Sequence, residues 1–191
     1  KINGSGGSGA NMFNIKEISS DLNLTSLNGV QNYLLGYQSF KSGLENIFFV
    51  DDYIFIGISN NKLLKLSGYG GTGSNMFNIT VNNNTFQSGP NYDSYLIGEQ
   101  DFESSVSDLI YLNNQLIIGF DNGKLIKVKE FGGTGLSMFN VIETETGFQT
   151  NNLFTNYLSG WQPFNSRISS LTMVNDQMFI GCGNGKLLKI D

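Results

Sequence analysis

The side chains that could carry out chemistry in this chain are few, because the sequence contains no histidine and one cysteine. Histidine is the commonest general base, activates serine and cysteine nucleophiles and is a frequent zinc ligand. Carboxylate pairs remain. Asp51-Asp52 is one, but related segments carry Asn113-Asn114 and Asn175-Asp176 at its position, which indicates a turn. Glu143 and Glu145 lie in a variable stretch, where we expect a solvated loop.

These residues predict no enzyme, no metal site and no cofactor. An enzyme whose active site depends on residues outside this sequence remains an alternative. Cys182 replaces Ile58 and Phe120 of the related segments, so we expect a buried apolar side chain there rather than a reactive thiol.

Three blocks of sequence recur in fixed order, with a period of about 62 residues. The first block spans Leu44–Leu66, Val106–Val128 and Ile168–Ile190. The second reads YLLGYQSF, YLIGEQDF and YLSGWQPF, from Tyr33, Tyr95 and Tyr157. The third reads GGSGANMFN, GGTGSNMFN and GGTGLSMFN, from Gly6, Gly70 and Gly132. The chain therefore divides into three copies, residues 1–66, 67–128 and 129–191, which form one array rather than independent domains.

Each copy has the pattern of antiparallel strands. Val106–Leu112 and Gln115–Phe120 are apolar runs separated by Asn113-Asn114, a pair that tolerates the positive φ angles of a tight hairpin. Lys124–Val128 follows an Asn-Gly turn, so three strands form a meander. A fourth strand comes from the MFN block (76–81) or from the YLIGEQ block (95–100), and the sequence does not decide between them. The two prolines, Pro90 and Pro163, are expected between strands.

A four-stranded sheet with two apolar faces is not stable alone, and stacking such sheets around an axis buries both faces. The stretch from Tyr95 to Val128 also resembles a degenerate WD-repeat blade, with a Leu-x-Gly entry, an inner strand and two hairpins. Gly36-Tyr37, Gly98-Glu99 and Gly160-Trp161 stand where that family has Gly-His, the Trp-Asp ending is absent, and the MFN block has no counterpart. Propeller lectins built from short repeats are similar too. We therefore predict an all-β fold, a β-propeller of four-stranded blades; a β-solenoid and a β-sandwich are the alternatives.

One position varies between the fixed glycine and glutamine of the second block. It holds Tyr37, Glu99 and Trp161, next to Gln38, Gln100 and Gln162. An aromatic platform beside an amide suits sugar recognition, so these six residues are the candidate ligand site. The alternative, which we favour, is that the glutamines tie neighbouring blades together through backbone hydrogen bonds. Asn14, Asn78 and Asn140 of the MFN blocks pose the same choice, with a turn or backbone cap favoured.

The glycine-rich block is not a phosphate loop, because it lacks the Gly-Lys-Ser/Thr ending and no helix follows it. Its recurrence favours a structural role, in which glycine permits a close backbone approach. Asp121-Asn122-Gly123 resembles part of a calcium loop, but the remaining ligands are absent, and it is interpreted as a hairpin.

Composition limits the partners. Charged residues make up 14% of the chain, and its net charge is −5 with no cluster of cations, which argues against nucleic-acid binding. No apolar run is long enough for membrane insertion. The abundance of Asn, Ser and Gly favours an extracellular or virion-associated location. We therefore expect a non-enzymatic binding or adhesion module, recognising a glycan or surface receptor on a phage or cell-surface appendage; the alternative is a purely structural assembly module.

Three blades are too few to close a propeller, which typically has about 4–8. Lys1-Ile2-Asn3-Gly4 aligns with Lys65-Leu66-Ser67-Gly68, so the sequence begins at the end of a strand and stops at an equivalent point. We therefore expect partners that are further repeats or other copies of the same chain. Two chains would give six blades in a two-fold assembly, and a lone chain is not expected to be a stable monomer.

Overall fold

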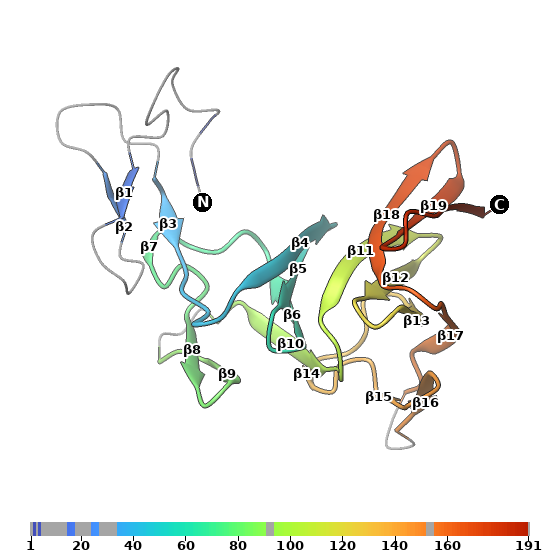
Figure 1. The fold of residues 1–191 in the computed structure, drawn as a ribbon. Helices are drawn as coiled ribbons and strands as arrows, with labels where there is room; N and C mark the ends of the chain where they lie inside the picture. The colour runs from blue at the N-terminus through green and yellow to red at the C-terminus, as the bar shows by residue number, and fades with distance from the viewer. Residues whose placement is uncertain are drawn as a thin grey trace. The chain divides into compact units, whose positions relative to one another are not determined.

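The protein is all-β. The computed structural model describes residues 2, 4, 15–17, 24–26, 34–90, 94–151 and 155–190. These residues form strands, turns and irregular segments, and no helix occurs among them (Figure 1). The search for a helix of bilayer-spanning length and hydropathy therefore finds none in this described part.

The chain divides into two units. The first comprises residues 1–41 and 69–96, and the second comprises residues 42–68 and 97–191. Among the described residues of the first unit, the strands are β1 (Ile15–Glu17), β2 (Leu24–Ser26), β3 (Gly36–Tyr37), β7 (Gly73–Ser74), β8 (Ile79–Asn82) and β9 (Thr85–Ser88). They form three two-stranded pairs, β1-β2, β8-β9 and the parallel pair β3-β7.

The second unit contains three larger sheets and one hairpin. Sheet 1 has the strand order β14-β10-β6-β5-β4, from β14 (Gly135–Leu136), β10 (Leu96–Asp101), β6 (Lys62–Ser67), β5 (Tyr53–Ile58) and β4 (Leu44–Val50). Sheet 2 has the order β11-β12-β13-β17, from β11 (Val106–Leu112), β12 (Gln115–Phe120), β13 (Lys124–Lys129) and β17 (Leu158–Pro163). Sheet 3 has the order β18-β19-β20, from β18 (Ile168–Val174), β19 (Gln177–Cys182) and β20 (Leu187–Ile190), and the separate hairpin is β15 (Val141–Glu143) with β16 (Phe148–Thr150).

The predicted meander is present in all three sheets with the same register. In each sheet the first residue of the first strand lies opposite the last residue of the second strand. These partners are Leu44 and Ile58, Val106 and Phe120, and Ile168 and Cys182, and each pairing has a bulge directly after the first of them. The hairpin prediction at Asn113-Asn114 is confirmed, because both residues have positive φ angles of 50° and 61°.

The fourth strand is the YLxGxQ block, and it comes from the following copy. Strand β10 of the second copy pairs with β6 of the first, and β17 of the third copy pairs with β13 of the second. A sheet and a sequence copy therefore do not coincide. The expectation that both prolines lie between strands is wrong for Pro163, which ends β17 opposite Lys124. Since β17 is an edge strand, the missing N–H of proline costs no ladder hydrogen bond.

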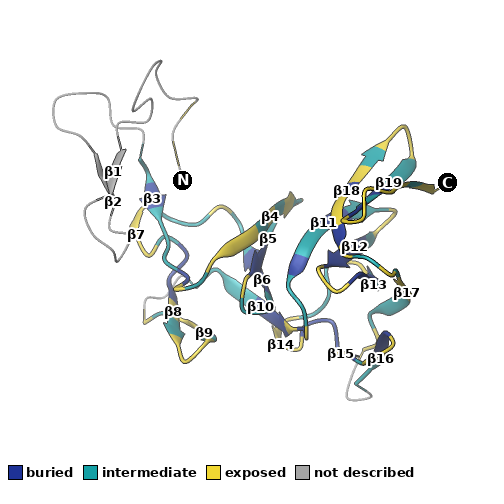
Figure 2. Cartoon of the chain, in the orientation of Figure 1, coloured by how far each residue is buried: buried dark blue, intermediate teal, exposed yellow. Residues whose placement is uncertain are grey.

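The core of the second unit lies between its sheets. Side chains of β5, β11 and β12 pack with Met138, Phe139 and Phe148 in one cluster, while Ile168, Leu171 and Cys182 pack with β12 and β13 in another. The expected burial of Cys182 is confirmed, with 8% of its surface exposed. The edge strands β4 of sheet 1 and β18 of sheet 3 are different, since both carry many exposed residues (Figure 2).

Candidate functional site

The amide of Gln100 binds two backbone groups of the next copy, and its Nε2 also donates to the carbonyl of the neighbouring Asp101 at 3.0 Å. Phe139 donates its backbone N–H to Oε1 of Gln100 at 3.1 Å, and Nε2 donates to the carbonyl of Val141 at 3.2 Å. Gln100 is buried, and so is Phe139. One side chain therefore satisfies two polar groups that would otherwise lie unpaired in the interior.

Gln38 makes the same bridge within the first unit. It accepts from the backbone N–H of Phe77 at 3.2 Å and donates to the carbonyl of Ile79 at 3.3 Å. Gln162 differs, because it is exposed and donates only to the neighbouring carbonyl of Pro163 among the residues that the structure describes. This geometry agrees with the favoured interpretation, in which the glutamines tie successive copies together.

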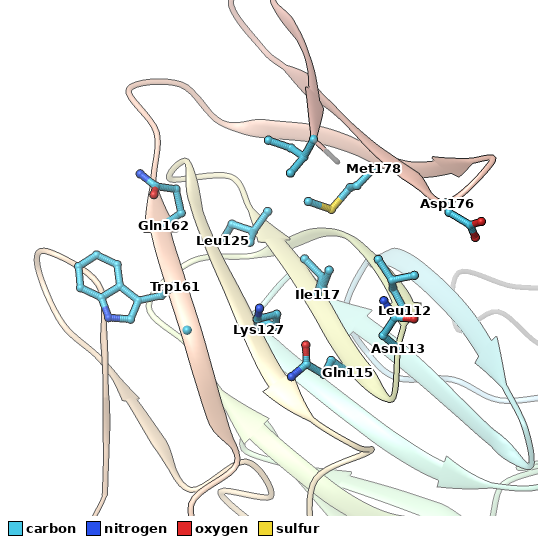
Figure 3. A pocket seen from close by; sticks show the side chains of 12 residues that line it. Leu112, Asn113, Gln115, Ile117, Leu125, Lys127, Trp161, Gln162, Asp176 and Met178 are labelled. Carbon is cyan, nitrogen blue, oxygen red and sulfur yellow. The ribbon is translucent and has the colours of Figure 1, made fainter.

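The varying residues point away from these amides. Successive side chains of a strand alternate between its two faces, so Trp161 lies opposite Gln162, as Glu99 does opposite Gln100. Figure 3 shows the Trp161 ring on the side of its strand away from Ile117 and Leu125. The structure therefore does not bring the predicted aromatic platform and amide together on one face, and a ligand role for the six residues stays a prediction.

Glu99 is buried and engaged with a cation rather than presented to solvent. Lys62 donates to Oε1 of Glu99 and to the exposed carboxylate of Asp101. Burial alone would lower the pKa of Lys62, but its hydrogen bonds to Asp101 and Glu99 and their negative charges outweigh that effect and raise it. The site thus fastens β10 to β6.

The glycine-rich block folds as a tight loop under its own phenylalanine. Gly132 has a φ of 68°, and a Cβ at this position would meet the Phe139 ring at 2.5 Å. Gly133 donates its N–H to the carbonyl of Met138 at 2.7 Å. Asn140 adopts a positive φ of 54°, which asparagine tolerates, so it forms a turn. The block's glycines are needed for this structure.

Lys65 is a buried cation that the sequence analysis did not single out. Its ammonium donates to the carbonyls of Gly132 and Gly133 at 3.2 and 3.3 Å and lies 4.5 Å from the centre of the Tyr53 ring. Burial lowers its pKa from 10.5 to about 8. The signal that could have revealed it is the recurrence of lysine at 65, 127 and 189.

We expect the free energy of unfolding to rise between pH 8 and pH 10.5, by up to about 3 kcal/mol. In this window the unfolded chain keeps the Lys65 proton that the folded chain has lost, since the folded pKa is about 8. The penalty for burying the charge is complete below the window and disappears above it. Urea unfolding across this range measures the effect. Lys65→Met should flatten the rise, whereas Lys127→Met should keep it; equal slopes in both variants would contradict the assignment.

Gln100→Leu should lower the free energy of unfolding by about 2–3 kcal/mol, because it leaves the N–H of Phe139 and the carbonyl of Val141 buried without partners. Gln162→Leu is the matched control, since the equivalent amide is exposed, and it should change stability by less than about 0.5 kcal/mol. Guanidinium unfolding of both variants tests this difference, and similar losses would refute the bridging role of Gln100.

The expectation that Glu143 lies in a solvated loop is wrong. Its side chain is 1% exposed and accepts from Lys124 Nζ at 3.0 Å, from Asn122 Nδ2 at 2.7 Å and from the backbone N–H of Glu103 at 2.7 Å. The variable stretch that carries Glu143 folds back as the β15-β16 hairpin and brings the carboxylate to Lys124. The contacts of Glu143 with Lys124, Asn122 and Glu103 therefore hold the hairpin against sheet 2.

A cavity of about 400 Å³ opens beside Gln162 (Figure 3). Its walls come from sheets 2 and 3, and its lining includes the apolar side chains of Ile117, Leu125 and Met178 with the polar ends of Lys127 and Gln162. Across the residues with described positions, no group of three or more His, Cys, Asp or Glu side chains is arranged to hold a metal ion.

No protein-family model and no curated protein matches this chain. Among the solved structures that align with it at low similarity are two designed proteins. The computationally designed Ika4 protein aligns at a TM-score of 0.38 and 10% identity, over 84% of this chain and 100% of Ika4. The computationally designed Ika8 protein aligns at a TM-score of 0.34 and 11% identity, over 86% of this chain and 48% of Ika8. TM-scores below 0.5 do not establish a common fold, so neither protein identifies this chain.

Proposed function

We propose that the three sheets are β-propeller blades and that the chain is a non-enzymatic structural module, which assembles with further copies of itself. The observation that carries this proposal is the exchange of strands between copies. The first two blades are completed by a YLxGxQ strand from the following copy, while β20 has no fourth strand beside it in the described part. A module built this way gains stability from each added copy.

The outer faces of the second unit support assembly too. Leu44 is 46% exposed, although its equivalents Val106 and Ile168 are fully buried. At the other end of the stack Leu187 is 70% exposed, whereas the equivalent Leu125 is buried. Apolar positions that are buried inside the stack and exposed at its ends are typical of a surface that takes a further blade.

Light scattering at several concentrations tests the proposal. We expect a two-chain species, six blades in all, that dissociates on dilution. A monodisperse monomer that unfolds cooperatively at every concentration would refute the assembly role.

A second candidate is glycan recognition on an extracellular or virion surface. The observation that favours it is the cavity beside Gln162, to which Gln115, Gln162 and Asp176 contribute polar side chains. A glycan-array screen with the wild-type chain tests this candidate, with Gln162→Ala as the matched variant. Binding that the substitution abolishes would support it, and an array without any bound glycan would argue against it.

A further inference from the structure

The cavity beside Gln162 has a filled counterpart one copy earlier. Its walls Ile117, Leu125, Met178 and Ile190 lie 62 positions after Phe55, Leu63, Leu116 and Val128. Those four residues form a single buried cluster with Met138 and Phe139 of the third copy. The same socket therefore occurs twice in the second unit, once filled by a GGxGxxMFN block and once empty.

The glycine at the floor of the socket shows the same difference. A Cβ on Gly98 would meet Sδ of Met138 at 2.9 Å and its Cβ at 3.1 Å, and one on Gly36 would meet Cβ of Met76 at 3.1 Å. On Gly160 the nearest heavy atom is Cε of Lys127, at 3.9 Å. A methionine therefore lies over the first two glycines, whereas the third has only the end of the Lys127 side chain near it, at van der Waals distance.

Hydrogen-bonding groups around the empty socket also match those of the filled one. Gln100 and Lys65 bind the backbone of the inserted block, at Phe139, Val141, Gly132 and Gly133. Their equivalents are Gln162 and Lys127, which border the cavity (Figure 3). Within the described residues, Gln162 donates only to its neighbour Pro163. The empty socket therefore presents both polar contacts that an inserted block requires.

We propose that this cavity is the docking site for the block GGSGANMFN, residues 6–14, of a second copy of the chain. The inference rests on the proposed assembly function and names the surface through which it occurs. Met12 and Phe13 are the equivalents of Met138 and Phe139, so they fill the apolar socket while Gln162 binds the backbone around Phe13. The YLLGYQ strand that follows then pairs with β20, as β17 pairs with β13.

Charge favours the first copy as the occupant. In the filled arrangement Lys124 pairs with Glu143 of the β15-β16 hairpin. The equivalent lysine of sheet 3 is Lys186, which is exposed. Five residues after the methionine of its MFN block the third copy has Glu143, and the first copy has Glu17 at that point, whereas the second copy has Val81. A first copy docked on sheet 3 thus supplies a carboxylate to Lys186, which forms no ion pair within the described residues.

A pair of single substitutions tests the docking site. Gly160→Leu should occupy the cavity, and its Cβ fits in the free chain because the nearest heavy atom is Cε of the flexible Lys127 side chain, at 3.9 Å. Met12→Asp places a charge on the inserted block and leaves the cavity intact. We expect each variant to lose the two-chain species even at about a hundredfold the wild-type dissociation concentration. Circular dichroism of each variant should retain the β-sheet spectrum of the assembled wild type, so that loss of the two-chain species is not caused by unfolding.

Mixing the two variants gives the sharper result. Gly160→Leu retains an intact block, and Met12→Asp retains an intact socket, so the 1:1 mixture should regain a two-chain species through one of the two interfaces. A mixture that stays monomeric while both variants are folded would overturn the docking site. Gly160→Leu that assembles as the wild type does would overturn it too, and the assembly function would stand. A wild type that is monomeric at all concentrations would refute both the docking site and the assembly function.

A soluble glycan offers the competing explanation of the same cavity. Suppose that a glycan binds the wild type and that Gly160→Leu abolishes this binding without affecting the two-chain species. The cavity is then a ligand site, and the docking proposal fails.

Charge exchange provides an independent readout of the docking site. Lys186→Glu and Glu17→Lys should each raise the dissociation constant, and the double variant should restore it; losses that simply add would contradict the predicted ion pair.

Discussion

Lys124→Met should lower the free energy of unfolding by about 3–5 kcal/mol, as removing one partner of a buried ion pair generally does. Glu143 is 1% exposed on its side chain, and its carboxylate accepts from Lys124 at 3.0 Å. Two neutral donors, from Asn122 and Glu103, complete its contacts but carry no charge. Without the ammonium the carboxylate stays buried and uncompensated. Guanidinium unfolding of the two proteins at pH 7 measures the loss.

The repeat supplies the control for this variant. Lys186 occupies the same position in sheet 3 but is exposed, so Lys186→Met should change stability by less than about 0.5 kcal/mol when measured below the dissociation concentration. The double variant Lys124→Met/Glu143→Leu should recover most of the loss, because an apolar pair of similar volume has no charge to bury. Equal losses from both lysine variants, or no recovery in the double variant, would contradict the buried-pair explanation.

The strands and hairpins of each sheet follow from local sequence, which is why they could be predicted. Apolar runs fix β11 and β12, and Asn113-Asn114 provides two residues that accept positive φ angles. The fourth strand could not be assigned, because both candidate blocks are compatible with a strand and the pairing crosses a copy boundary. A choice of that kind depends on packing between distant segments, which a strand pattern does not encode.

Long-range contacts also explain the errors at single residues. Glu143 looked solvated since its own stretch is polar and variable, but its partner Lys124 lies 19 positions earlier in the sequence on another sheet element. Lys65 was overlooked because lysine on a strand usually faces solvent. Its burial is made tolerable by the carbonyls of Gly132 and Gly133 and by the Tyr53 ring. The role of the glutamines could be predicted more readily than that of Glu143 or Lys65, since an amide repeated at one position indicated a recurring backbone contact.

The recurrence of one socket in two states gives the structure its clearest functional signal. Gly98 and Gly160 occupy the same position of the same block, yet Met138 packs over Gly98 while only the end of the Lys127 side chain lies near Gly160. From the sequence alone, Gly98 and Gly160 are equivalent positions of the repeat and cannot be told apart. In the described part of the chain, Met138 of the following copy lies over Gly98 and no such methionine lies over Gly160, a difference that only the packing reveals.

Gly132→Ala should lower the free energy of unfolding by about 2–5 kcal/mol, from two separate costs. The φ of 68° is one that an L-residue with a Cβ adopts at a cost of about 1–2 kcal/mol. The new Cβ would also lie 2.5 Å from the ring of Phe139, which is fully buried, and overpacking of a core typically costs about 1–3 kcal/mol.

Gly68→Ala separates these two costs, since Gly68 has a φ of 63° but no heavy atom within 4 Å of the added Cβ. It should cost only about 1–2 kcal/mol, the price of the backbone conformation. Combining Gly132→Ala with Phe139→Leu should relieve part of the steric cost. Urea unfolding of the wild type, the two single variants and the double variant should therefore show a favourable coupling between positions 132 and 139. Equal losses for Gly68→Ala and Gly132→Ala, with no coupling to Phe139, would mean that the loop is not folded tightly against this ring. The GGxGxxMFN block would then not be the preformed unit that the docking site requires, because its glycine pair and its phenylalanine insert together.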